Sequence, residues 1–228
     1  MNIDEYKQKM FAIANRYDKR ARGAKYIRQW DIHYPEKEYM VKKAEEFGML
    51  DNVKTAIEIG TGVGMLPYLL MQKGIHVEAT DVDEEQTGPM YKQCCDIINL
   101  KRHHLWIDNG KPMDFPGKYD LFIATRTVFD RECLKPGELF DWKFFFNDVF
   151  QYVDKVFIKT NNAGSGKGYP DYLKKYLYNP MGEGLGKPFR AWYIKITKEM
   201  WSSDPNSCLL YTSPSPRDGC RSRMPSSA

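Results

Sequence analysis

The sequence of 228 residues has no apolar run of about 18 residues, the length that a membrane-spanning helix requires. Its first segment, MNIDEYKQKMFAIANRYDKR, is charged throughout and lacks the apolar core of a secretory signal. The five cysteines have no C-x-x-C spacing, and the four histidines add no zinc-site pattern. These absences predict reduced thiols, a cytoplasmic location, and a chain with neither a membrane anchor nor a bound metal.

The sequence also has little excess of charge. There are 34 Lys and Arg residues against 30 Asp and Glu residues, a formal net charge of +4. The segment 208–228, CLLYTSPSPRDGCRSRMPSSA, carries three Arg and one Asp, so +2 of the total belongs to it (3 − 1 = 2). This segment has no periodicity and resembles translated sequencing-adapter text, so we expect 207–228 to be a non-native or disordered tail. The remaining charge gives no support to a general affinity for nucleic acid or membranes.

Strand and helix patterns alternate along most of the chain, which indicates an α/β protein with a mostly parallel sheet and helices on both faces. The last strand pattern has no long helix before it, so we expect it to close the sheet in the antiparallel direction. We expect an N-terminal helical cap over 1–50 and one further domain over 51–206. Strands are predicted at 54–59, 76–80, 104–107, 119–124, 155–159 and 190–197, and helices at 3–22, 35–47, 65–73, 84–100, 142–152 and 170–178.

The most informative segment is 56–83, AIEIGTGVGMLPYLLMQKGIHVEATDVD. Its pattern is typical of a strand, a glycine turn, a helix and a second strand that ends at Asp81. Gly60, Gly62 and Gly64 stand at every second position, where a backbone without side chains can lie against a ligand. The helix start that follows offers free N–H groups, and an acid at the end of the next strand can hold ribose hydroxyls. The segment therefore predicts half of a nucleoside-binding site.

The glycine spacing distinguishes between classes of nucleoside. A dinucleotide fingerprint needs G-x-G-x-x-G, and counting from Gly60 places Met65 at its last position. The pattern that begins at Glu58, E-x-G-x-G-x-G, instead resembles the first motif of the class I S-adenosylmethionine-dependent methyltransferases. This resemblance covers residues 53 to 159. It implies a Rossmann-like, doubly wound sheet, S-adenosylmethionine as cofactor, and methyl transfer as activity.

The resemblance also implies which residues hold the methyl donor. Glu58 would lie near the ammonium group of the donor, Asp81 would accept from the ribose hydroxyls, and Val82 would lie beside the adenine. Asp83 is a competing ribose acid that lies past the strand end. Asp108 would accept from the adenine amino group, or else it belongs to a turn. The full predicted set of donor-binding residues is Glu58, Gly60, Thr61, Gly62, Gly64, Asp81, Val82, Asp108 and Thr125.

The sequence indicates fewer residues for binding the methyl acceptor than for binding the methyl donor. The predicted fourth strand ends at Thr125 and Arg126, where the resemblance places the transferred methyl group. Enzymes that methylate nucleic-acid bases often carry Asn/Asp-Pro-Pro-Tyr/Phe there, whereas this chain has ATRT. Arg126 is predicted to bind an anionic acceptor, or else to pair with Asp130 or Glu132. Tyr34 is a second candidate contact to the acceptor, and no catalytic base is identified.

These patterns predict an S-adenosylmethionine-dependent methyltransferase that acts on a small molecule. Orientation alone can supply about 7–11 kcal/mol of such a barrier, so the site can work without a conspicuous catalytic residue. Three alternatives stay open: an NAD(P)-dependent oxidoreductase, a non-catalytic nucleoside-binding module, and an RNA methyltransferase. The last depends on the basic and aromatic segment 16–30, which is also typical of a solvated helix face. The oligomeric state is not predicted.

Overall fold

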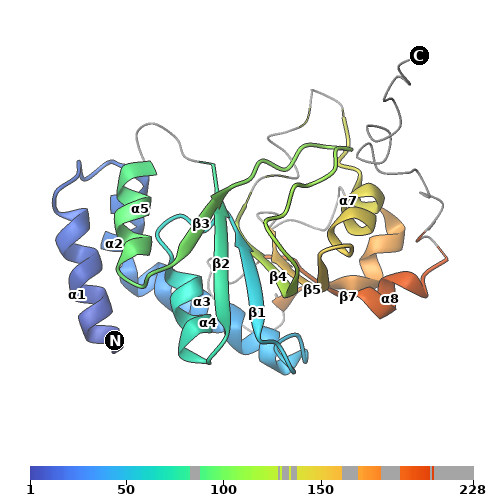
Figure 1. Ribbon diagram of the computed structural model, residues 1–228, viewed down its shortest axis with the longest axis horizontal. Helices are drawn as coiled ribbons and strands as arrows, with labels where there is room; N and C mark the ends of the chain where they lie inside the picture. Colours follow the sequence, from blue (N-terminus) through green and yellow to red (C-terminus); the bar gives the residue numbers. More distant parts are fainter. Residues whose placement is uncertain are drawn as a thin grey trace, which may run out of the picture.

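The structure, a computed structural model, describes residues 1–82, 88–127, 129, 134, 138–160, 169–180, 191–205 and 207. A seven-stranded sheet runs through the molecule, with helices on both of its faces (Figure 1). The helices are α1 (Ile3–Ala14), α2 (Arg22–Arg28), α3 (Trp30–Glu46), α4 (Met65–Gln72), α5 (Gly88–Asp96), α7 (Trp142–Val149), α8 (Lys198–Ser202) and the 3-10 helix η1 (Asp171–Tyr176). The strands are β1 (Thr55–Ile59), β2 (His76–Asp81), β3 (Lys101–His104), β4 (Tyr119–Thr125), β5 (Val153–Lys159), β6 (Leu177–Tyr178) and β7 (Tyr193–Thr197).

The strand order is β3-β2-β1-β4-β5-β7-β6. Strands β1 to β5 pair in parallel, whereas β7 is antiparallel to both β5 and β6. The predicted Rossmann-like, mostly parallel sheet with an antiparallel closing strand is therefore confirmed. Strand β1 is the switch point of the sheet, because the chain adds β2 and β3 on one side of it and β4 and β5 on the other. Ligands of such sheets bind outside the carboxyl ends of the strands at this point.

Alternate residues of the central strands supply two cores, one on each face of the sheet. Leu121 and Ile123 of β4 pack into the core that α1 to α5 share, and Phe122 packs into the core beside α7 and α8. In Figure 1, α1, α2 and α5 lie on the left of the molecule and α7 and α8 on the right. Because both faces are covered, the parallel strands are apolar almost without interruption.

The N-terminal helices belong to the first of these cores. The ring of Tyr6 on α1 stacks on Tyr68 of α4, with 4.0 Å between the centroids, and α3 packs against α4. The predicted N-terminal helical extension is therefore present and covers one face of the sheet. The division of the chain at residues 50 and 206 stays a prediction. None of the described helices is long and apolar enough to cross a membrane.

The predicted helix 3–22 is wrong in extent, since α1 ends at Ala14 and α2 begins at Arg22. Gly23, which we expected to end the first helix, lies inside α2 and against α5 instead. A Cβ atom at Gly23 would lie 2.5 Å from Cε1 of Tyr91. This glycine therefore allows two helices to approach closely, and it does not terminate one.

The helix expected to begin at Pro35 begins at Trp30 instead. Pro35 is the sixth residue of α3, where it removes one intrahelical hydrogen bond, and the helix continues past it. The expected end is closer to the structure, because α3 ends at Glu46 and Gly48 follows with φ of 66°.

The third strand was predicted at 104–107 and lies at 101–104. Side-chain bonds to β2 accompany this register: Nζ of Lys101 lies 2.9 Å from Oε1 of Glu78, and Nε2 of His103 lies 2.6 Å from Oε2. The apolar residues that suggested the later position, Leu105 and Ile107, leave the strand and enter the core beside α7.

Two further predicted helices differ from the structure. The described part of 84–100 forms α5 over Gly88–Asp96, and residues 83–87 lie outside the described residues. The predicted helix 170–178 is the 3-10 helix η1 followed by β6, which pairs with β7.

We expect Phe122→Ala to lower the free energy of unfolding by about 3–5 kcal/mol, because the ring is fully buried and contacts Phe115 and Phe145. Chemical denaturation monitored by circular dichroism measures this loss. Leu139→Ala is the control, since Leu139 is 79% exposed and its truncation should change the stability by less than about 0.5 kcal/mol. Equal losses in the two variants would show that Phe122 does not carry the core.

Candidate functional site

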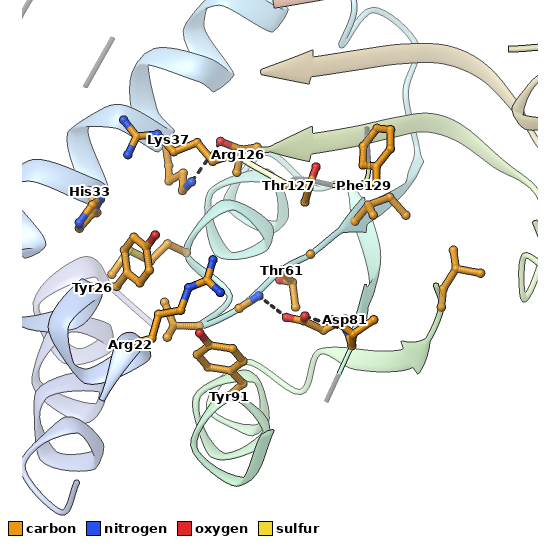
Figure 2. Close-up of a pocket in the computed structure, with 18 of the residues that line it drawn as sticks. Arg22, Tyr26, His33, Lys37, Thr61, Asp81, Tyr91, Arg126, Thr127 and Phe129 are labelled. Carbon is orange, nitrogen blue, oxygen red and sulfur yellow. Dashed lines mark hydrogen bonds between the residues drawn. The ribbon is translucent and has the colours of Figure 1, made fainter. Parts of the chain in front are cut away.

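A pocket of about 200 Å³ opens at the carboxyl ends of β1, β2 and β4, at the switch point of the sheet (Figure 2). Residues of α2 and α3 line it on one side, and Thr127 and Phe129, which follow β4, line it as well. The residues that line it are Arg22, Tyr26, His33, Lys37, Ile59, Gly60, Thr61, Gly62, Val63, Met65, Asp81, Val82, Tyr91, Leu105, Trp106, Ile107, Thr125, Arg126, Thr127 and Phe129.

The glycine turn after β1 forms the floor of this pocket. Gly60 and Gly62 have φ of 68° and 54°, in the left-handed region that favours glycine. A Cβ atom on Gly62 would have only Cζ of Tyr91 within 4 Å, at 3.9 Å, so the main chain faces open space there. Gly64 precedes α4 and packs against Cys95 instead. A Cβ atom on Gly60 would lie 2.3 Å from Cγ2 of Thr127, so of these three glycines only Gly62 offers open backbone to a ligand.

Asp81 brings the end of β2 to this turn. Its Oδ2 accepts a hydrogen bond from the N–H of Gly62 at 2.7 Å, and its Oδ1 accepts one from the N–H of Val82 at 2.9 Å. The side chain is 11% exposed and lines the pocket. The glycine turn and the acidic strand end, which are far apart in the sequence, thus form one continuous wall.

Glu58 lies behind that wall and is 1% exposed. Its Oε2 and the hydroxyl of Thr61 have no hydrogen-bond partner among the described residues. Burial raises the pKa of Glu58 to about 7, the negative charge of Asp81 adds to this, and Thr61 and the positive charge of Lys37 oppose it. Buried carboxyl groups in proteins usually have hydrogen-bond partners for both oxygens. A cation near Glu58 would stabilise its ionised form.

A second buried carboxylate lies beside Arg126 of the pocket wall. Glu36 of α3 is fully buried; its Oε1 contacts Nζ of Lys159 and lies 2.7 Å from Nε of Arg126. Burial acts to raise the pKa of Glu36, but the ring of His33, whose Nδ1 lies 3.7 Å from Oε2, and the charges of Lys37, Lys159 and Arg126 lower it to about 2. Glu36 is therefore ionised and compensated, in contrast to Glu58.

Several residues of the pocket wall were not predicted. Nζ of Lys37 donates to Oγ1 of Thr125 at 3.1 Å, and the ring of Tyr26 lies 4.4 Å from that of His33 (Figure 2). Trp106 contributes to the wall while remaining 49% exposed. These residues stand on α2, on α3 and after β3, and no sequence motif marks them.

Most of the residues predicted to bind the methyl donor or the methyl acceptor line the pocket. Four predicted residues are not among the described residues that line it. The wall contains Gly60, Thr61, Gly62, Asp81, Val82, Thr125 and Arg126, whereas Glu58, Gly64, Asp108 and Tyr34 lie away from the surface of the pocket.

Asp108 and Tyr34 contact neighbouring side chains and do not line the pocket. The carboxylate of Asp108 accepts from Nε1 of Trp106 at 2.8 Å and from Nζ of Lys111 at 2.7 Å. Tyr34 is buried and its ring stacks on Trp30, with 4.7 Å between the centroids. Their predicted contacts to a ligand stay predictions.

Other predictions for this region lie outside the described residues. Asp83 belongs to this group, as do Asp130 and Glu132, the alternative partners of Arg126. Within the described part of the chain, Arg126 pairs with Glu36.

No family model matches the sequence, and no curated protein matches it. Solved structures with a similar fold include an S-adenosylmethionine-dependent methyltransferase from Clostridium acetobutylicum, 17% identical with a TM-score of 0.43 over 67% of this chain; the alignment spans only 57% of that protein. A variant of MtNAS in complex with S-adenosylmethionine is 12% identical, with a TM-score of 0.47, over 85% of this chain and 72% of that one. A protein of Thermoplasma acidophilum is 14% identical, with a TM-score of 0.45, over 86% of this chain and 98% of that one. At these identities the likeness is one of fold, and the Rossmann-like fold itself follows from the strand order of the sheet.

Proposed function

We propose that this chain is an S-adenosylmethionine-dependent methyltransferase that acts on a small molecule. The observation that carries the proposal is the buried, incompletely partnered carboxyl group of Glu58 behind an open glycine turn. A ligand that combines a cation with ribose hydroxyls would satisfy both Glu58 and the neighbouring Asp81. S-adenosylmethionine has that combination of groups, and a nicotinamide dinucleotide has no ammonium group to offer Glu58.

The residues of the pocket fit this donor. The ammonium group of its methionine part would gain from the charge of Glu58, and its ribose hydroxyls would donate to Asp81. Among the described residues, each oxygen of Asp81 accepts one backbone hydrogen bond, and Nη2 of Arg102 lies 4.0 Å from Oδ2. The main chain at Gly62 would lie against the donor, since a Cβ atom there would have only the ring of Tyr91 within 4 Å.

The contribution of the protein to catalysis would be binding, orientation and exclusion of water. When bound, the donor supplies a methyl group on a sulfonium, which a lone pair of the acceptor can attack directly. Thr125 and Arg126, at the end of β4, would border the acceptor. Holding the two reactants in line is worth about 7–11 kcal/mol in favourable models, so no covalent intermediate is needed. The aromatic rings that line the pocket, which include those of Tyr26, Tyr91 and Trp106, would keep water from the reacting atoms.

Isothermal titration calorimetry with S-adenosylhomocysteine and with NADH separates this proposal from an oxidoreductase. We expect S-adenosylhomocysteine to bind and NADH not to bind. Incubation with labelled donor and a pool of metabolites then separates an enzyme from a nucleoside-binding module, because only an enzyme yields a labelled product. Tight binding of NADH alone would overturn the proposal. The cytoplasmic location stays a prediction.

We expect Asp81→Asn to weaken the binding of S-adenosylhomocysteine roughly 10- to 100-fold, because hydrogen bonds to a charged acceptor are worth about 1.5–3 kcal/mol. The amide oxygen can still accept from Gly62, so the turn should keep its shape. Calorimetry measures the affinity, and Asp96→Asn, on the exposed face of α5, is the control with the same change of charge. Unchanged affinity would assign the ribose to another group.

We expect Gly62→Val to abolish this binding, because its side chain would project into the pocket. Gly74→Val is a matched control: Gly74 also has a positive φ, of 80°, and a Cβ atom there would meet nothing within 4 Å. Both variants should lose similar stability, about 1–2 kcal/mol from the left-handed backbone. Binding that survives in Gly62→Val would show that the turn does not approach the ligand.

We expect Glu58→Gln to stabilise the ligand-free protein at pH 8 by about 2–3 kcal/mol relative to the wild type. The pKa of Glu58 is about 7 in the folded chain against an ordinary value of 4.5, so below pH 4.5 the group is protonated in both states and contributes nothing. As the pH rises from 4.5 to 7, the unfolded state loses this proton first, and folding becomes less favourable. The difference between variant and wild type should therefore grow across that window and stay constant above it.

Denaturation at a series of pH values measures the effect of Glu58→Gln. Glu38→Gln, at an exposed position of α3, is the control and should show no such pH dependence. A stability difference that does not change between pH 4.5 and 7 would show that the pKa of Glu58 is not raised in the folded protein.

A further inference from the structure

We infer that the acceptor is a small anion, with a carboxylate or phosphate group that Lys37 and Arg126 bind at the end of β4. This inference rests on the proposed function, because it assigns the acceptor half of the same pocket. The observations that support it are the charges of the wall, the contacts of Lys37, and the conformation of Arg126.

The described wall of the pocket is rich in positive charge. Among the described residues, Arg22, Lys37 and Arg126 line it together with the carboxylate of Asp81, and Arg126 also pairs with Glu36. The proposed donor adds a net charge of about +1, since it carries a sulfonium, an ammonium and one carboxylate. An anionic acceptor would be attracted to this positive charge in a partly desolvated space, and a neutral acceptor would not be.

Lys37 is the cation whose surroundings are most consistent with such a ligand. Its ammonium group donates to Oγ1 of Thr125 at 3.1 Å and has no carboxylate within 4.0 Å among the described residues. An ammonium group has three donors, so two of them are available on the side of the pocket. Lys159, one strand away, differs in that it is fully buried and in contact with Glu36.

The charge state of Lys37 depends on several neighbours. Burial lowers the pKa of Lys37, and the charge of Arg126 lowers it further, while Glu36 and Glu58 raise it. A bound anion would act in the same direction as the two carboxylates. The ammonium form would therefore be stabilised by the ligand that it binds.

Arg126 is held at this place by its main chain and its side chain together. It has φ of 55°, an uncommon conformation for a residue with a side chain, and its N–H donates to the carbonyl of Lys159 at 2.9 Å. Its Nε lies 2.7 Å from Oε1 of Glu36, which makes Glu36 a positioning residue for the guanidinium. A residue keeps such a backbone conformation only where the surrounding structure holds it. Residues of this kind are concentrated at ligand-binding sites.

The remaining wall is suited to an apolar body attached to the anionic group. The rings of Tyr26, Tyr91, Trp106 and Phe129 line the pocket. Benzoate and phenyl phosphate are therefore suitable probes, and benzyl alcohol is a neutral probe of similar shape.

The test is calorimetric titration of the three probes into the full-length chain, with and without saturating S-adenosylhomocysteine. We expect benzoate or phenyl phosphate to bind at least about tenfold more tightly than benzyl alcohol, and the affinity to fall with rising salt concentration. Lys37→Met should weaken anion binding at least about tenfold. Lys42→Met, an exposed position on the same helix, is the matched control and should leave it unchanged.

Three outcomes would overturn the inference. They are equal binding of benzyl alcohol, unchanged anion binding in Lys37→Met, and displacement of S-adenosylhomocysteine by the anions, which would assign the cations to the carboxylate of the donor. Lys37→Arg keeps the charge and should restore binding to within about threefold, which separates a charge effect from misfolding. Absence of S-adenosylhomocysteine binding with intact anion binding would refute the proposed function instead, so the two failures are distinguishable.

Discussion

A single buried carboxylate joins the N-terminal helices to the ends of the central strands. Glu36 of α3 meets Lys159 at the end of β5 and Arg126 just beyond β4. Removing charges from water costs several kcal/mol each, and the loss of one partner leaves another charge uncompensated. The position of α3 over the pocket, and with it the placement of His33 and Lys37, therefore depends on this cluster being complete.

The contrast between two buried acids explains how the same fold provides both rigidity and a binding site. Glu36 and Glu58 are both almost inaccessible to water, yet their pKa values are displaced in opposite directions. The first is surrounded by cations and serves to hold elements together. The second has fewer cations around it and lies behind the wall of the pocket, outside its surface.

The sequence allowed the sheet and the glycine turn to be predicted, because both depend on local periodicity and on residues without side chains. It did not allow the N-terminal helices to be delimited, since Gly23 and Pro35 act there through packing and position within a helix. The wall formed by Tyr26 and Lys37 was also missed. Each reaches the pocket only because α2 and α3 fold over the strand ends, and no spacing rule connects those helices to Asp81.

The closeness of α2 and α5 at Gly23 has a consequence for the shape of the entrance. Arg22 and Tyr26 stand on α2 and Tyr91 stands on α5, so the spacing of these two helices sets the width of one side of the opening. A methyl group added at Gly23 would collide with Cε of Met90 and Cε1 of Tyr91, so it would move a ring that lines the pocket. The width of the opening would then change without a substitution of any residue in the pocket wall.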